Sequence, residues 1–293
     1  MYKSTYEALK TGQGTWLKSN FHTHTGVCEP GKCGILPLDD VVDAYNKAGC
    51  NVLAISNHDR YILREKQYGN ISIIDAVEYS TNPHMLLIGV NEFHDLPHQE
   101  AIDKAVTSGG FVILCHPNWQ RREYFPNKLI DTLTGFTGLE IVNGVVHSLP
   151  GSGLALDTWD YILSQGRKVW GFGNDDFHLY NNIDRVYNMI YAKSSSYEDI
   201  KEAVINGCFY VSSGVALKEY SLEDNALFVK AGYLKETYIN NFEYKITGAD
   251  GRVLLKTEAE DLRFKIPASE PYVRIEVTAD YGAKMYLQPV FRI

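Results

Sequence analysis

The chain has 293 residues, of which 45% are hydrophobic and 22% are charged, and its formal net charge is −8 at pH 7. This length is enough for a single barrel, or for one large domain and a small one. The acidic balance, without any Lys/Arg-rich run, disfavours general binding to a nucleic-acid backbone. The longest apolar stretches are strand-sized and the N-terminus has no continuous apolar h-region. We therefore expect no membrane span, no secretory signal and a cytoplasmic location.

The five cysteines are an odd number in a chain that is expected to be intracellular, so reduced thiols are the default. Cys28 and Cys33 follow His22 and His24 closely, which suggests a zinc knuckle. No second cysteine pair follows in the sequence, so thiol-rich structural zinc is not the favoured interpretation.

Two histidines one residue apart, His22 and His24, follow the first apolar segment, and a strand is predicted over residues 16–22. In an extended strand the side chains at i and i+2 project from the same face, so both imidazoles can reach one cation. A polar lead-in precedes this strand, and an irregular loop with Glu29 follows it. The next segment, residues 38–47, has helical periodicity and ends before a glycine stop signal.

Later strand-like segments also present His, Asp or Glu where an apolar run ends. These segments are residues 51–59, 73–80, 84–90, 110–119, 138–144 and 169–178. Residues 71–78 and 84–90 are expected to pair as a hairpin, and Pro117 is expected to hold His116 in an extended conformation. Helices are predicted over residues 98–108, 154–164 and 197–206. This alternation indicates parallel βα units, whose active sites lie at the C-terminal ends of the strands.

The pattern changes near Leu217, beyond which short alternating strands replace helical periodicity. Ala249-Asp250-Gly251 is a strong hairpin signal in this region. We therefore predict a first domain over residues 1–216 and a separate small β-sandwich domain over residues 217–293.

Together, the motifs of the chain resemble the PHP (polymerase and histidinol phosphatase) superfamily of metal-dependent phosphoesterases. These motifs are His22-Thr23-His24, Asn57-His58-Asp59, Glu78, His84, His116-Pro117 and Asp176-Phe177-His178. They follow the expected order over nearly the whole chain, and residues 156–178 and 200–215 look like a branch with a C-terminal β-domain. The resemblance implies an α/β fold, a distorted (β/α)7 barrel, with up to three divalent metal ions.

The resemblance also implies how the metal ligands divide into sub-sites. The first sub-site would have four ligands: His22, His24, Glu78 and Asp176. Glu78 would bridge to a second sub-site, which His84 and His116 would complete.

The third sub-site would take His58, His178 and a residue of the loop after the first strand, where the family usually has Asp or His. The matching position in this chain is Glu29, which is a sound hard-oxygen ligand but departs from the usual residue.

A mixed imidazole and carboxylate set suits Zn, Mn or Fe. We expect two or three such ions to activate a hydroxide in a hydrolase that cleaves a small phosphomonoester or phosphodiester. Glu78, Asp176 and His178 are the expected catalytic residues. Arg121 and Arg122 are the expected phosphate-binding residues, although each also fits a solvated surface position.

Two alternatives stay open. The same metals activate water toward a carbonyl carbon, so a carbamate or amide-ester hydrolase is the second enzymatic interpretation; a non-catalytic metal-binding module is the third. No protein nucleophile is indicated, because Ser212-Ser213-Gly214 lacks the nucleophile-elbow pattern. His94, His98 and His147 are expected not to be ligands. Asp59 and Asp175 either orient ligand imidazoles or serve as ordinary caps.

Overall fold

A computed structural model describes residues 1–26, 34–62, 65–120, 124–234 and 241–293. The α-helices are α1 (Leu38–Lys47), α2 (His98–Thr107), α3 (Asn127–Ile130), α4 (Leu156–Ser164) and α5 (Tyr197–Ile205). Short 3-10 helices are η1 (Glu7–Thr11), η2 (Val146–Ser148), η3 (Tyr180–Asn182) and η4 (Ala249–Gly251). In the described ranges, no helix has the length and apolarity needed to cross a membrane.

The strands of the first two thirds of the chain are β1 (Tyr2–Lys3), β2 (Thr15–Asn20), β3 (Val52–Ile55), β4 (Gln67–Tyr68), β5 (Ile71–Tyr79), β6 (Met85–Ile88), β7 (Phe111–Leu114), β8 (Gly138–Asn143), β9 (Trp170–Asn174), β10 (Tyr187–Ala192) and β11 (Phe209–Ser212). Those of the last third are β12 (Val215–Glu223), β13 (Ala226–Tyr233), β14 (Phe242–Thr247), β15 (Val253–Ala259), β16 (Asp261–Lys265), β17 (Tyr272–Ala279), β18 (Lys284–Leu287) and β19 (Val290–Arg292).

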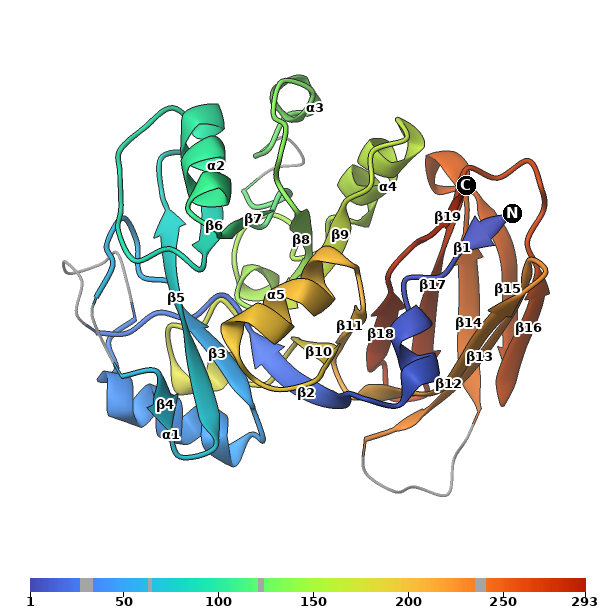
Figure 1. Cartoon of the computed structure of the whole chain (residues 1–293), viewed down its shortest axis with the longest axis horizontal. Helices are drawn as coiled ribbons and strands as arrows, with labels where there is room; N and C mark the ends of the chain where they lie inside the picture. The colour runs from blue at the N-terminus through green and yellow to red at the C-terminus, as the bar shows by residue number, and fades with distance from the viewer. Residues whose placement is uncertain (27–33, 63–64, 121–123, 235–240) are drawn as a thin grey trace.

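The fold is mixed α/β and is built on a mostly parallel central sheet (Figure 1). Its strand order is β10-β2-β3-β5-β6-β7-β8-β9, with parallel pairs on both sides of an antiparallel segment formed by β5, β6 and β7. A parallel bridge between Thr23 and Phe177 links the end of β2 to the segment after β9. The segments that follow β2 and β9 therefore meet.

Continuous apolar runs explain why these strands lie inside the molecule. β3, β6 and β7 are buried along their whole length, as expected for strands covered on both faces. The ring of Phe21 packs edge to face against those of Phe111 and Phe172, with centroid distances of 5.7 and 6.0 Å. These buried strands form the apolar core, and the polar residues of interest lie at their ends.

Most predicted elements of this region are confirmed. The helix over 38–47 has the predicted bounds, and the predicted hairpin is the antiparallel pair β5–β6. The side chain of Ser196 caps α5 by accepting a hydrogen bond from the backbone N–H of Asp199. The Ala249-Asp250-Gly251 turn joins the antiparallel strands β14 and β15.

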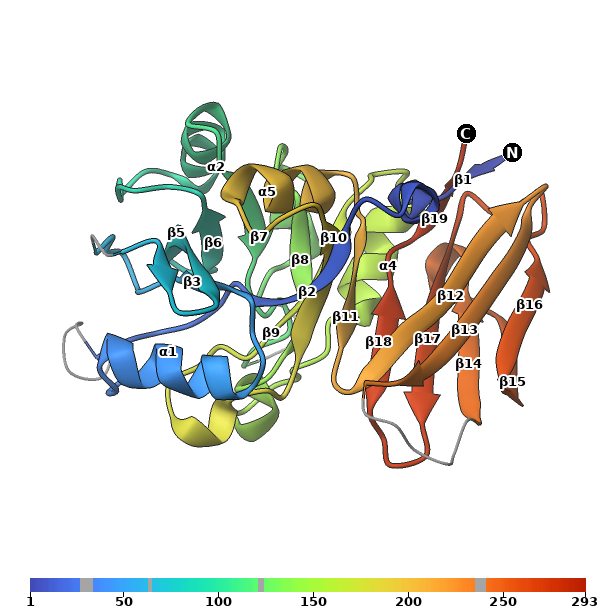
Figure 2. The same cartoon turned by 60° about the horizontal axis from the view of Figure 1, so that its bottom comes forward.

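The last third of the chain is almost entirely β-structure in two layers (Figure 2). β12, β13 and β16 form a three-stranded sheet, and β12 packs against β17 and β18 of the larger sheet. Hydrogen bonding is continuous across the predicted domain boundary, because β11 pairs with β18. The N-terminal β1 pairs with β19 near the C-terminus, a non-local contact that its local sequence does not indicate. The boundary between residues 216 and 217 stays a prediction.

A buried ion pair ties α4 to β17. The guanidinium of Arg274 donates to both carboxylate oxygens of Asp160, at 2.7 and 2.6 Å, and Tyr272 Oη donates to the same carboxylate at 3.0 Å. We expect Asp160→Ala to lower the free energy of unfolding by about 3 kcal/mol, because it leaves a buried cation unpaired. Urea denaturation measures the change.

The matched control is Glu243→Ala, which removes a partly exposed ion pair with Lys256 on the surface of the same sheet. This variant should lose less than about 1 kcal/mol. If Asp160→Ala lowers the free energy of unfolding no more than Glu243→Ala does, the Asp160–Arg274 pair does not hold α4 and β17 together.

Candidate metal centre

The structure brings together all eight described residues that were predicted as metal ligands. They fall into overlapping groups whose ligand atoms lie within 4.8 Å of one another: His22, Glu78, Cys115 and His116; His24, His58 and His178; His22, His24 and Asp176; and His58, Glu78 and His84. Glu78 lies within β5, His84 directly precedes β6 and the others follow the ends of strands, so the central sheet brings them together.

Glu78 lies at the centre of this cluster. It is the penultimate residue of β5, and its carboxylate is 1% exposed. Five imidazoles surround its two oxygens: those of His84, His22 and His116 lie 2.9, 3.3 and 3.5 Å from Oε1, and those of His58 and His24 lie 2.8 and 3.3 Å from Oε2. A carboxylate with different imidazoles at each oxygen has the arrangement needed to bridge two cations.

Asp176 provides a second carboxylate on the side where β2 and β9 meet. Its Oδ1 lies 3.3 Å from Nε2 of both His22 and His24, and 3.5 Å from Nδ1 of His178. The backbone carbonyl of Asp176 also accepts a hydrogen bond from His178 Nδ1 at 2.8 Å. The two catalytic residues predicted after β9 are therefore next to the paired histidines of the first motif.

The backbone is strained at three positions of the site. Asp59, His116 and Asp176 have positive φ angles of 48°, 30° and 54°, a region that non-glycine residues rarely adopt. The prediction that Pro117 holds His116 extended is therefore wrong. His116 instead donates its backbone N–H to the buried carboxylate of Glu140 at 2.9 Å, while its ring faces Glu78.

Glu140 forms hydrogen bonds that hold residues of the cluster in place. It is fully buried in β8 and accepts hydrogen bonds from His22 Nδ1 at 2.8 Å and from the side-chain amides of Asn143 and Asn174, both at 2.9 Å. The bond from His22 Nδ1 fixes the imidazole tautomer and leaves Nε2 free to face Glu78 and Asp176. The sequence places Glu140 at a strand end, but we assigned it no role.

The donor set and its unmet valences fit divalent metal ions. In the described cluster, buried atoms of the predicted ligands without a hydrogen-bond partner include Nε2 of His22, both ring nitrogens of His24 and Nδ1 of His116. Leaving so many buried polar atoms unpaired is costly in a folded protein unless another group satisfies them. Imidazole and carboxylate ligands together are typical of Zn, Mn and Fe sites.

The pKa values of the clustered side chains are shifted by burial and by their charged neighbours. Burial alone would lower the pKa of His22, but the carboxylates of Asp176, Glu78 and Glu140 outweigh it and hold that pKa well above its usual value. Burial opposes ionisation of Glu78, yet the neighbouring His22 and His58 hold its pKa well below its usual value. Burial and the adjacent His178 lower the pKa of His24 to about 3.

These shifts predict that metal binding releases protons. The raised pKa of His22 means that its ring keeps a proton at neutral pH in the metal-free protein, whereas a ligand imidazole must be neutral. The apparent metal affinity should therefore weaken by about tenfold per pH unit for each proton released as the pH falls below that raised pKa. Calorimetric titration with zinc in buffers of different ionisation enthalpy counts the protons; His22→Gln should release one fewer, and zero net release by the parent protein would contradict the assignment.

A cavity of about 540 Å³ opens onto the cluster. It is lined by predicted ligands, among them Glu78, His84, His116, Asp176 and His178. The lining also includes apolar residues, which are Trp119, Val145, Val146 and Leu149. Its size is in the range of small-molecule sites, so a small ligand can reach the clustered carboxylates and imidazoles.

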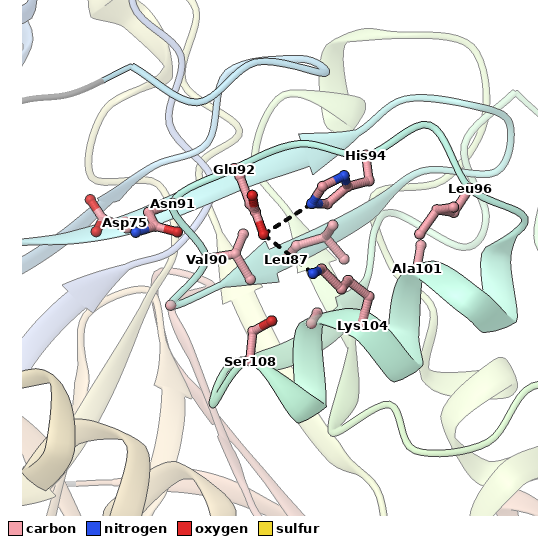
Figure 3. A pocket seen from close by; sticks show the side chains of 12 residues that line it. Asp75, Leu87, Val90, Asn91, Glu92, His94, Leu96, Ala101, Lys104 and Ser108 are labelled. Atoms are coloured by element: carbon pink, nitrogen blue, oxygen red, sulfur yellow. Dashed lines mark ion pairs between the residues drawn. The ribbon is translucent and has the colours of Figure 1, made fainter.

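A second, smaller hollow of about 150 Å³ lies between β6 and α2 (Figure 3). Its only close ionic contacts among the residues drawn join Glu92 to His94 at 3.0 Å and to Lys104 at 3.4 Å. None of its lining residues belongs to the ligand groups described above. The larger cavity is therefore the candidate functional site.

Other predicted residues are placed as follows. Asp59 accepts hydrogen bonds from the backbone N–H and the hydroxyl of Ser80, and Asp175 accepts three backbone N–H groups of residues 184–186. His98 donates to the carbonyl of Pro83 and contacts no ligand group in the described chain.

Glu29, Arg121 and Arg122 lie outside the described residues, as do Cys28 and Cys33 of the suggested zinc knuckle. Their predicted roles stay predictions. Cys115 is a residue that we did not single out for the site: its buried thiol belongs to the group of His22, Glu78 and His116. A cysteine at the end of an apolar strand, directly before a predicted ligand, is the signal that could have identified it.

Comparison with known proteins supports the fold. The crystal structure of a two-domain protein from Bacteroides vulgatus, described as containing a predicted PHP-like metal-dependent phosphoesterase, superposes with a TM-score of 0.54. The match covers 94% of this chain and 88% of that chain at 15% sequence identity. No protein-family model matches the sequence, and no curated protein matches it. The chain thus shares its fold with that two-domain protein, and its described residues include His, Glu, Asp and Cys groups that could hold metal ions.

Proposed function

We propose that this protein is a metal-dependent hydrolase of the PHP-like type and that it cleaves a small phosphomonoester or phosphodiester. The observation that carries the proposal is the carboxylate of Glu78, buried among five imidazoles at one end of the cavity. The described part of the cluster retains every His, Glu and Asp ligand that the motifs predict there, which argues against a non-catalytic module with a decayed site.

Bound divalent cations would polarise the phosphate oxygens and lower the pKa of a water molecule to near neutrality. The chain's own residues would set the geometry. Glu78 would bridge neighbouring cations, His22, His24 and Asp176 would complete one sub-site, and His84 and His116 a second. His58 and His178 would form a third sub-site with Glu29. Glu140 would keep His22 and His116 in their ligand orientations.

The finer description of the fold is part of this proposal. We interpret β2, β3, β5, β6, β7, β8 and β9 as a distorted (β/α)7 barrel, which the Thr23–Phe177 bridge would close. The chain beyond residue 216 would then be a separate β-sandwich domain. Arg121 and Arg122 would bind the phosphate, and their replacement by alanine would mainly raise KM.

The experiment is metal analysis of freshly purified protein, followed by phosphate release from a panel of phosphate esters with Zn, Mn or Fe added back. Two or three metal ions per chain and metal-dependent phosphate release would support the proposal. A fully metal-loaded protein that cleaves carbamates or amide esters but no phosphate ester would contradict it, and would favour the second enzymatic interpretation.

A further inference from the structure

Four residues of the cavity lining form an apolar wall that the proposed chemistry does not use: Trp119, Val145, Val146 and Leu149. Trp119 contributes a half-buried indole ring, with its centroid 4.9 Å from that of His116 and 5.7 Å from that of His84. Val145, Val146 and Leu149 form the rest of the wall, and Leu149 is 43% exposed. Indole and aliphatic side chains thus lie within one small-molecule length of the clustered carboxylates.

One side chain fixes this wall relative to the cluster. The amide oxygen of Asn143 accepts hydrogen bonds from the backbone N–H groups of Val145 and Val146, at 3.2 and 3.0 Å. Its amide nitrogen donates to Glu140 at 2.9 Å and to Asp176 at 3.1 Å. The side chain of Asn143 therefore links the apolar wall to the candidate metal site through hydrogen bonds.

The two loops that carry the wall are also joined to each other. Gln120 donates its backbone N–H to the carbonyl of Pro150, and Ser152 donates its own to the carbonyl of Asn118, at 2.8 and 2.9 Å. An antiparallel bridge pairs Trp119 with Gly151. Gly151 has a φ of 125°, and a Cβ atom there would lie 2.4 Å from the backbone nitrogen of Gln120, so only glycine fits this approach. These backbone hydrogen bonds and the bridge therefore join the loop of Trp119 to the loop that follows Leu149.

The charge of the described lining adds a second constraint on the substrate. It contains three carboxylates, those of Asp59, Glu78 and Asp176, and neither lysine nor arginine. An ionised group that packed against the apolar residues of this lining would lose its contact with water. A sugar or glycerol group would likewise lose hydrogen bonds to water against this wall.

We infer that the substrate's ester group carries a compact apolar, preferably flat, substituent that packs against the apolar wall of Trp119 and Leu149. The inference rests on the proposed phosphoesterase function and narrows its substrate class. It predicts a preference for arylalkyl or aryl phosphates over sugar, glycerol and nucleotide phosphates.

The test compares benzyl phosphate with glycerol 2-phosphate on the metal-loaded full-length protein. Both are monoesters of ordinary alcohols, so the comparison reports contacts of the substituent and not leaving-group acidity. We expect kcat/KM to favour benzyl phosphate by about tenfold or more, the scale of burying a small apolar group. In Leu149→Asn this ratio should fall by about threefold, mainly through the KM of benzyl phosphate. The matched control is Ile205→Asn, on α5 and similarly exposed at 46%, which should keep the parental ratio.

Binding of benzylphosphonate and methylphosphonate, measured by calorimetry, separates this inference from the proposed function. Tighter binding of benzylphosphonate, weakened in Leu149→Asn, supports the apolar wall even if neither ester is hydrolysed; that outcome contradicts only the hydrolytic function. Hydrolysis of both esters with equal kcat/KM, together with equal binding of both phosphonates, overturns the inference and leaves the phosphoesterase proposal standing.

Discussion

Glu78→Gln is expected to lower kcat/KM for phosphate esters on the order of 10³-fold or more while the protein stays folded. Glutamine has nearly the same size but lacks the negative charge that five imidazoles surround. Loss of a shared metal ligand removes charge stabilisation worth several kcal/mol, and each ~1.4 kcal/mol corresponds to a factor of ten. Steady-state kinetics should be measured with the metal content of each variant.

The matched control is Glu92→Gln, the same substitution at an exposed carboxylate that pairs with His94 and Lys104 in the second hollow (Figure 3). It should keep the parental metal content and turnover. Near-parental turnover in Glu78→Gln would show that this carboxylate is not a ligand shared by two metal ions. This conclusion would not depend on the result for Glu92→Gln.

Glu140→Gln is expected to weaken metal affinity by about 10–100-fold, although Glu140 is not among the residues that line the cavity. The carboxylate accepts hydrogen bonds from four groups, on His22, His116, Asn143 and Asn174. A glutamine amide offers one oxygen and a donor NH2 group, so at least one of these donors would face another donor. Such a buried mismatch costs about 1–3 kcal/mol and frees His22 to change its tautomer.

Chelator competition measures the affinity, and the ¹⁵N chemical shifts of the His22 ring report its tautomer directly. A purely structural role would lower the melting temperature without changing that tautomer or the affinity. Parental affinity and an unchanged tautomer in Glu140→Gln would therefore contradict the positioning role.

The residues of the cluster could be predicted because most of them follow a short local pattern in the sequence. An apolar run that ends in His, Asp or Glu places its polar side chain at a strand end, and parallel strands bring such ends together. The helix over 38–47 and the β5–β6 hairpin were predictable for the same reason, since their signals lie within the segments themselves.

The remaining features depend on contacts between distant segments. The left-handed backbone of His116 follows from a hydrogen bond to Glu140, which is 24 residues away, and this contact overrides the local preference of a residue before proline. The pairing of β1 with β19 joins the two ends of the chain. The apolar wall requires Trp119 and Leu149 to line the same cavity. Nothing in the local sequence of either residue indicates that the other lies nearby.

The most direct measurement is anomalous X-ray diffraction from crystals of the zinc-loaded protein at the zinc absorption edge. The account predicts two or more peaks around the carboxylate of Glu78, at bonding distances of about 2.1 Å from ring nitrogens that include Nε2 of His22 and His24. A metal-loaded, active protein whose anomalous peaks all lie away from Glu78 and Asp176 would contradict it.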